Sequence, residues 1–157
     1  MGIGIYLGQL EQLDQFKYMS NNFKIKLITP SGIAYEGEVV EASLPTPDGQ
    51  ISILKNHMPI ITLLSPGEIK IKGGIKEQYL STEGGVAYIS KNFLKILADT
   101  AESADSLDMA KIELARKRAE QSLLNARSDV EFGSAQALLE KQLAKIRFIK
   151  KRHRQKY

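Results

Sequence analysis

The sequence predicts an α+β protein in which an antiparallel β-sandwich, or flattened barrel, is followed by an antiparallel two-helix hairpin. Up to about residue 100, short apolar runs alternate with turn residues, as in a sandwich or barrel of short strands. Beyond that point apolar residues recur every three or four positions, which is typical of amphipathic helices. We therefore divide the chain into an N-terminal extension (1–20), a β-sandwich domain (21–102) and a helical hairpin with a basic tail (103–157).

Composition is that of an ordinary globular protein and excludes several kinds of chemistry. The 157 residues, 43% hydrophobic and 25% charged, suffice for one compact domain with an appendage. The absence of cysteine excludes disulfides and thiolate metal ligands. No apolar run approaches the roughly 20 residues that span a bilayer. We therefore expect any attachment to a membrane to depend on another molecule.

The first 20 residues carry neither of the common targeting signals. They lack the basic region and long apolar core of a secretory signal, and the Arg-rich, acid-poor character of an organellar presequence. Apolar residues between Ile3 and Phe16 follow a rough helical stripe, and the first clear strand starts after Ser20. We interpret residues 1–20 as an extension that is poorly ordered or forms a short helix.

The first β segments are separated by a Pro-Ser-Gly turn. Residues 23–29 alternate apolar and basic side chains, which is typical of a half-buried strand. Residues 33–44 form a longer β-rich segment in which Gly37 indicates a bulge or bend.

Residues 48–67 contain short apolar runs punctuated by proline, glycine and asparagine, which predicts very short strands. Between Asp48 and Pro59 the chain exposes Lys55, Asn56 and His57 among apolar neighbours. We interpret this part as a docking loop.

The remaining β segments begin with a hairpin. Residues 68–72 and 75–82 form its strands, and Gly73-Gly74 is its two-residue turn signal. Residues 86–89 and 93–99 add two more strands, giving eight or so in total.

The first helix is expected to start near Ser103, Asp105 or Ser106, whose side chains can accept hydrogen bonds from free backbone N–H groups. Asp108 in its first turn complements the helix dipole, and the helix runs to about Asn125. Its apolar side is a narrow seam of mostly small residues, namely Ala115, Ala119, Leu123 and Ala126.

Residues 128–131 interrupt this pattern, and a second helix is expected from about Phe132 or Gly133. Its apolar stripe comprises Ala135, Leu139, Leu143, Ile146 and Ile149. Two stripes joined by a short polar turn form an antiparallel hairpin. Burial of apolar surface contributes about 25 cal/mol per Å², and an Ala-rich seam buries little of it, so the hairpin alone should be only marginally stable. We therefore expect the hairpin to be able to detach from the sandwich and extend.

Charge is divided unevenly along the chain. Residues 1–105 carry 9 Lys and Arg against 12 Asp and Glu, whereas residues 106–157 carry 13 against 6. The basic second half indicates an acidic partner surface, which could be protein, nucleic acid or lipid headgroup. Its terminal cations are Lys145, Arg147, Lys150, Lys151, Arg152, Arg154 and Lys156.

Nucleic-acid binding is therefore an alternative function, since this run would bind phosphates well. A solvated basic helix end explains the same residues, and the few aromatic residues offer no evident stacking platform. Transcript-cleavage factors have a hairpin with an acidic tip, comparable to Asp129 and Glu131, but there the hairpin precedes the globular domain.

Catalysis has little support in the sequence. The two histidines, His57 and His153, lie far apart, and neither Gly-Gly pair is followed by the residues of a phosphate-binding loop. Glu36, Glu38 and Glu41 are most simply a solvated strand face. We expect no catalytic residue and no metal site.

The run GQISILKNHMPIIT, from Gly49 to Thr62, places a histidine, a proline, an apolar pair and a threonine in a fixed order. In that order it resembles the epsilon subunit of F-type ATP synthases. Residues 97–102 with 107–108, and 128–132 followed by 144–149, match the same family, so the resemblance extends from about residue 23 to 149. It implies a ten-stranded sandwich with two C-terminal helices, in a non-catalytic rotor subunit that couples the c ring to the gamma subunit of the central stalk.

The resemblance also implies that the docking loop faces the c ring and gamma, through Gly49, Gln50, Lys55, Asn56, His57 and Pro59. Gln50 stands where the family often has an acidic residue, so we expect this contact to depend more on shape than on charge. Apolar faces of the sandwich and hairpin would pack on gamma.

In the family the two helices are a regulatory arm that permits ATP hydrolysis when compact and blocks it when extended along gamma. The cations that meet the acidic loop of a catalytic beta subunit, beside alpha, would be Arg116, Lys117, Arg118, Arg127, Lys145, Arg147, Lys150 and Lys151. We expect those of the second helix to matter most.

Some members bind ATP on the folded hairpin through an I/L-D-x-x-R-A motif. Here residues 107–112 read LDMAKI, with Lys for Arg and Ile for Ala. The corresponding site would be Asp108, Lys111 and Arg147, and Lys lacks the bidentate geometry of Arg. We expect weak or no ATP binding and no cofactor.

The resemblance thus implies a central-stalk subunit whose partners are gamma, the c ring and the beta and alpha subunits, with no nucleic acid. Its location would be peripheral, on the cytoplasmic face of a bacterial inner membrane through the complex, or the equivalent place in an organelle. A basic nucleic-acid-binding β-domain protein is the alternative.

Overall fold

The computed structural model describes residues 8–9, 12 and 21–156, so the expectation for residues 1–20 falls almost entirely outside the described residues. Nine strands and two long helices follow in order along residues 21–156. The strands are β1 (Phe23–Thr29), β2 (Gly32–Val39), β3 (Glu41–Thr46), β4 (Gly49–Ile53), β5 (Ile60–Leu64), β6 (Gly67–Gly73), β7 (Lys76–Thr82), β8 (Gly85–Ile89) and β9 (Phe93–Ala98). The helices are a short 3-10 helix η1 (Ala104–Ser106), α2 (Met109–Leu124) and α3 (Asp129–Arg154).

The strands form two sheets that pack as a sandwich, which confirms the predicted fold class. One sheet has the order β2-β1-β9-β8-β5 and the other β4-β3-β6-β7. Every pairing is antiparallel except that of β1 with β9, which is parallel. This contact joins the two ends of the β region, so no hairpin signal in the sequence could indicate it.

The core between the sheets follows from the alternation of the strands. In β1, Phe23, Ile25 and Leu27 are buried while Lys24 points to solvent. Leu44 and side chains of β6 and β9 complete the same cluster. Gly85 starts β8 at φ +147°, and a Cβ there would lie 2.1 Å from the Leu97 carbonyl oxygen, so only glycine fits this close approach.

Three local predictions in the β region are corrected. Residues 33–44 are not one segment, because β2 and β3 belong to different sheets and separate at Val40. The irregularity in β2 lies opposite Leu27 and Ile28, not at Gly37, which pairs regularly with Ile25. The β6–β7 turn is shifted by one residue, since Gly73 pairs with Lys76.

The start of each helix also differs from the prediction. The side chain of Asp108 caps α2 by accepting from the backbone N–H groups of Ala110 (3.0 Å) and Lys111 (3.4 Å). Ser128 caps α3 by accepting from the Glu131 N–H (3.1 Å), while the Glu131 carboxylate accepts from the Arg127 N–H (2.8 Å). Residues 128–131, predicted to be a break, thus contain the cap that starts α3.

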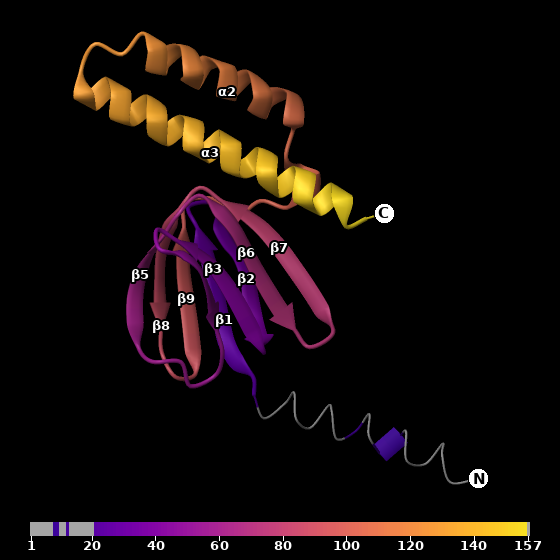
Figure 1. Cartoon of the computed structure of the whole chain (residues 1–157). Helices are drawn as coiled ribbons and strands as arrows, with labels where there is room; N and C mark the ends of the chain where they lie inside the picture. Colours follow the sequence, from indigo (N-terminus) through magenta and orange to yellow (C-terminus); the bar gives the residue numbers. More distant parts are fainter. Residues whose placement is uncertain (1–7, 10–11, 13–20, 157) are drawn as a thin grey trace.

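The hairpin lies across one end of the sandwich. Figure 1 shows α3 crossing above the strands, with α2 packed on the side of α3 that faces away from them. The hairpin has its own apolar cluster of Ile112, Ile146, Phe148 and Ile149, separate from the core between the sheets. The two parts are therefore distinct packing units.

Candidate functional site

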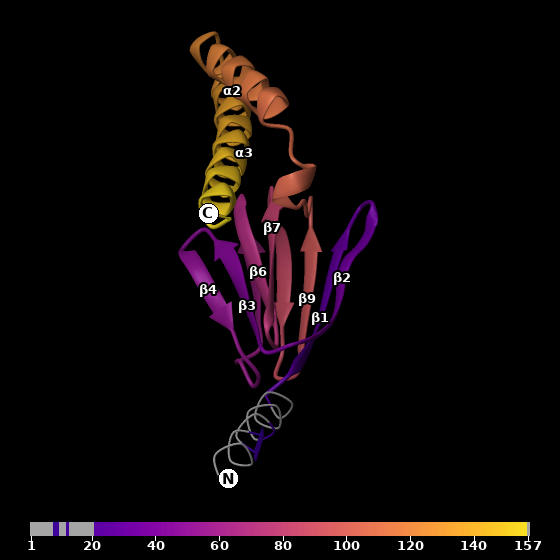
Figure 2. The same cartoon turned by 90° about the vertical axis from the view of Figure 1, so that its right-hand side faces the viewer.

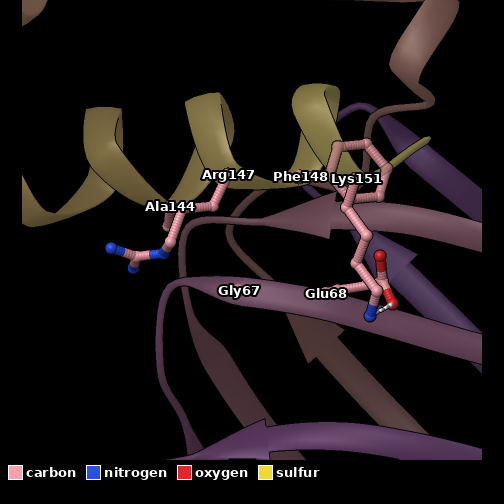
Figure 3. A pocket seen from close by; sticks show the side chains of 6 residues that line it. All are labelled: Gly67, Glu68, Ala144, Arg147, Phe148 and Lys151. Carbon is pink, nitrogen blue, oxygen red and sulfur yellow. Dashed lines mark hydrogen bonds and ion pairs between the residues drawn. The ribbon is translucent and has the colours of Figure 1, made fainter. Parts of the chain in front are cut away.

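The C-terminal half of α3 rests on the rim of the sandwich where β6 begins and β7 ends (Figure 2). Ala144 and Phe148 line a shallow pocket there against Gly67 and Glu68. Figure 3 shows Lys151 reaching down to Glu68, whereas Arg147 points away from it. Ala144 brings only a small side chain to this contact, whereas the space beside Gly67 is taken by Pro45 of β3, whose Cβ would lie 2.8 Å from a Cβ at residue 67.

Arg152 makes the most enclosed polar contact of this interface. Its side chain is 8% exposed, and its guanidinium Nη2 lies 3.0 Å from Glu68 Oε2. The same group stacks on the Tyr79 ring, 3.5 Å from the ring centroid. Lys151 Nζ adds a contact of 3.2 Å to Glu68 Oε1. Removing one partner of such an enclosed pair costs about 3–5 kcal/mol, because the other charge stays buried without compensation.

Tyr79 is itself oriented by a second ion pair on the sheet. Its hydroxyl donates to the carboxylate of Glu77, which lies 3.1 Å from Lys70 Nζ. The Tyr79 hydroxyl, and then Lys70, hold the pKa of Glu77 below its ordinary value. The Glu77 carboxylate in turn raises the pKa of Lys70. The ring that carries Arg152 is thereby fixed in place.

Lys145 forms a second ionic contact between α3 and the sandwich. Its Nζ lies 2.7 Å from Glu83 and 3.6 Å from Glu102. Glu102 belongs to the segment after β9, and its backbone exchanges hydrogen bonds with Ser81 of β7. Lys156 adds a contact of 3.0 Å to Asp105. The docked face of α3 is thus cationic and meets carboxylates of the sandwich.

The eight predicted arm cations do not form one cluster. Arg116 is neutralised within α2 by Glu113 (2.8 Å) and Glu120 (2.6 Å), and these contacts raise the pKa of Arg116. Lys145 and Lys151 face the sandwich. The others, Lys117, Arg118, Arg127, Arg147 and Lys150, are exposed and form no ion pair within residues 21–156.

The predicted docking loop is divided by β4. Gly49 and Gln50 begin β4, directly after the β3–β4 turn, and the Gln50 amide donates to Ser43 Oγ and to the Glu68 carbonyl, both at 3.0 Å. Lys55, Asn56, His57 and Pro59 follow the opposite end of β4. There the Asn56 N–H donates to the Lys91 carbonyl (2.7 Å), and His57 Nδ1 bonds the Met58 carbonyl (2.8 Å).

The predicted nucleotide residues are engaged in local structure. The Asp108 carboxylate is the α2 cap, and Lys111 meets it through its backbone N–H rather than its ammonium group. Arg147 projects from α3 into solvent (Figure 3). Within the described part of the chain, no group of three or more side chains suited to a metal ion occurs, and no helix there is long and apolar enough to cross a membrane.

The outer face of the five-stranded sheet exposes a row of apolar side chains. The sequence predicted an apolar face on the sandwich but did not identify its residues. Leu63, Val86, Leu97, Ile28 and Ile33 stand opposite one another across β5, β8, β9, β1 and β2. Leu63 is 63% exposed, and its neighbour Ile61 is 67% exposed. The signal in the sequence was the run IITLL in β5, which is apolar on both faces. We call this row the outer apolar face; a contiguous patch of this kind marks a protein-binding surface.

Comparison with known proteins adds independent observations. Residues 22–104 match the family described as "ATP synthase, Delta/Epsilon chain, beta-sandwich domain". The chain is 37% identical over 133 residues to the ATP synthase epsilon chain of Clostridium kluyveri, covering 84% of this chain and all of that one. It is 34% identical to that of Caldanaerobacter subterraneus (85% and 97% covered) and 39% identical to the plastid epsilon chain of Prototheca wickerhamii (71% and 84%).

Solved structures share the fold at low sequence identity. A chain in the structure of the Euglena gracilis mitochondrial ATP synthase, OSCP/F1/c-ring, superposes with a TM-score of 0.69 at 17% identity, covering 78% of both chains. A chain in the central stalk/c-ring structure from Tetrahymena thermophila gives 0.51 at 16% identity, covering 82% of this chain and 94% of that one. At these identities the likeness shows the fold.

Proposed function

This chain belongs to the epsilon subunits of the F-type ATP synthase, and on that premise we propose that it is a non-catalytic subunit of the central stalk that couples the c ring to gamma. The observation that carries the proposal is the division of the molecule into two packing units. One unit is a sandwich suited to a fixed position, and the other is a hairpin suited to movement.

The sandwich would bind gamma through the outer apolar face. That face lies on the sheet opposite the one whose strands β6 and β7 contact α3, and it exposes Leu63 and Ile61 to solvent. Burying such side chains contributes about 25 cal/mol per Å² of apolar surface. The β3–β4 turn and the loop from Lys55 to Pro59, at opposite ends of β4, are the candidate contacts to the c ring.

The hairpin would act as an arm that restrains ATP hydrolysis when it leaves the sandwich. Its exposed cations, Arg147 and Lys150 on α3 and Lys117, Arg118 and Arg127 before it, would meet an acidic loop of a catalytic beta subunit beside alpha. Cations in the last turns of α3 are also favoured there by the helix dipole.

Removing α3 tests the arm. A chain ending at Ser128 should raise the ATPase rate of the assembled enzyme several-fold, because the main cationic helix is gone. The matched variant Arg147→Gln/Lys150→Gln, which leaves the docking contacts of Lys145 and Arg152 intact, should raise it partly. An assembled enzyme whose rate is the same with the full and the shortened chain would contradict an inhibitory arm.

Two further expectations belong to the same proposal. The protein would be peripheral to the membrane through the complex, on the cytoplasmic face in a bacterium. ATP would bind weakly or not at all, since the Asp108 carboxylate caps α2 and Lys111 replaces an arginine. Calorimetry with ATP should therefore give little heat, and saturable binding at low micromolar concentration would overturn this expectation.

A further inference from the structure

We propose that Arg152, held between Glu68 and Tyr79, is the latch that keeps the hairpin docked on the sandwich and sets how often it is free to leave. This inference rests on the proposed function only for the role of the undocked hairpin as an inhibitory arm. Docking itself is a property of the isolated chain and is tested there.

The hairpin as a whole is held through α3. Helix α2 packs on α3 and faces away from the strands (Figure 1), so α3 provides the contact with β6 and β7. Within residues 21–156, Tyr79 is the one hydrophobic strand residue that packs against the apolar cluster of the hairpin, and Phe148 lines the pocket beside Gly67 and Glu68. The apolar contact with the strands is therefore narrow, and ion pairs on the same side of α3 add to it.

Arg152 makes two of these contacts at one place. Its guanidinium pairs with the Glu68 carboxylate at 3.0 Å and stacks on the Tyr79 ring at 3.5 Å. Lys151 binds the same Glu68 carboxylate. Its Nε is buried and has no hydrogen-bond partner. Undocking would return that group and both charges to water, so the contact stabilises docking without making it irreversible.

Lys145 adds a second point of attachment on the same face of α3. It precedes Arg152 by seven residues, which is two helical turns, and pairs with Glu83 and Glu102. The cations of both attachments are largely buried, with 14% of the Lys145 side chain and 8% of the Arg152 side chain exposed, so raising the ionic strength weakens the ion pairs only modestly.

The latch also masks part of the cationic surface. Lys145 and Lys151 are among the residues expected to meet an acidic partner, and both face carboxylates of the sandwich while the hairpin is docked. An acidic partner must therefore compete with Glu68, Glu83 and Glu102 for them. Release of Arg152 makes these cations available at the moment the arm becomes free.

Distance measurements on the isolated full chain test the latch. Because the chain has no cysteine, spin labels at Lys76→Cys and Ser134→Cys report only the separation of sandwich and hairpin. The parent chain should give one narrow distance population. Glu68→Gln and Arg152→Met should each increase a second, broader population a hundredfold or more, because each leaves a buried charge without its partner. High salt should increase that population to a smaller extent. Glu36→Gln, an acid-to-amide change on β2 away from α3, is the matched control and should leave the distribution unchanged.

The double variant Glu68→Gln/Arg152→Met distinguishes the pair from general packing. With both partners removed, no buried charge is left without compensation, so the double variant should undock less than the sum of the single effects. Equal distributions in the parent, both single variants and the control would overturn the latch, and so would strict additivity. Protected amides in β1 and β9 verify that the sandwich of each variant is folded. The distance measurement involves no ATPase activity, so it tests the latch alone. The shortened chain in the assembled enzyme tests the inhibitory arm alone.

Discussion

Single residues determine both the shape of the sandwich and the position of the hairpin. Gly85 permits β8 to approach Leu97, and Tyr79 offers the ring on which Arg152 stacks. Glu68 serves two neighbours, since its carboxylate holds α3 and its backbone carbonyl accepts from Gln50 at the β3–β4 turn. The docked helix and this turn are therefore linked through one residue.

The close approach at Gly85 leads to a stability prediction. Gly85→Ala should lower the free energy of unfolding by at least about 3 kcal/mol, because the new Cβ would collide with the Leu97 carbonyl and φ stays positive. Gly32→Ala is the matched control: φ is +126° but the space around it is open, so its cost should be about 1 kcal/mol. Urea denaturation measures both, and equal losses would contradict the role given to the collision.

Secondary-structure elements divide into those that the sequence predicts and those that need tertiary context. The alternation of apolar and basic side chains in residues 23–29 was sufficient to predict β1. The recurrence of apolar residues every three or four positions was sufficient to predict both helices. The predicted start of α3 was wrong because Ser128 accepts from the Glu131 N–H and the Glu131 carboxylate accepts from the Arg127 N–H, so polar residues that looked like a break begin the helix. The β1–β9 pairing and the Arg152–Glu68 contact join residues far apart in the chain, and no local pattern indicates either.

The cap at Ser128 is testable within the hairpin. Ser128→Ala removes the acceptor of the Glu131 N–H and should cost about 1 kcal/mol, which is about a fivefold loss of amide protection in the first turn of α3. Ser134→Ala, an exposed serine inside the same helix, should not reduce protection. Hydrogen exchange that falls equally in both variants would show that Ser128 has no capping role.

At the scale of the whole molecule, two packing units meet through ion pairs, and a third surface, the outer apolar face, is open to a partner. The family resemblance correctly indicated the order of sandwich and hairpin. It did not indicate that β4 separates the two halves of the docking loop, because that depends on which strand lies between them.

The outer apolar face gives a binding prediction. Leu63→Lys should weaken binding of the chain to its gamma subunit by tenfold or more, since it places a charge in the middle of an apolar contact. Ile75→Lys, at a β6–β7 turn position that is 97% exposed, is the control and should bind as the parent does. Calorimetric titration compares them, and similar affinities for all three chains would place gamma on another surface.

The central claim is that the hairpin works by leaving the sandwich, and a reversible lock tests it most directly. Glu83→Cys and Lys145→Cys replace an ion pair of 2.7 Å between the sandwich and α3, and a short cleavable crosslinker that reacts with two thiols can join them in the assembled enzyme. The locked enzyme should hydrolyse ATP as fast as one carrying the chain shortened after Ser128, and cleaving the reagent should restore the slower rate. Equal rates before and after cleavage would contradict the account.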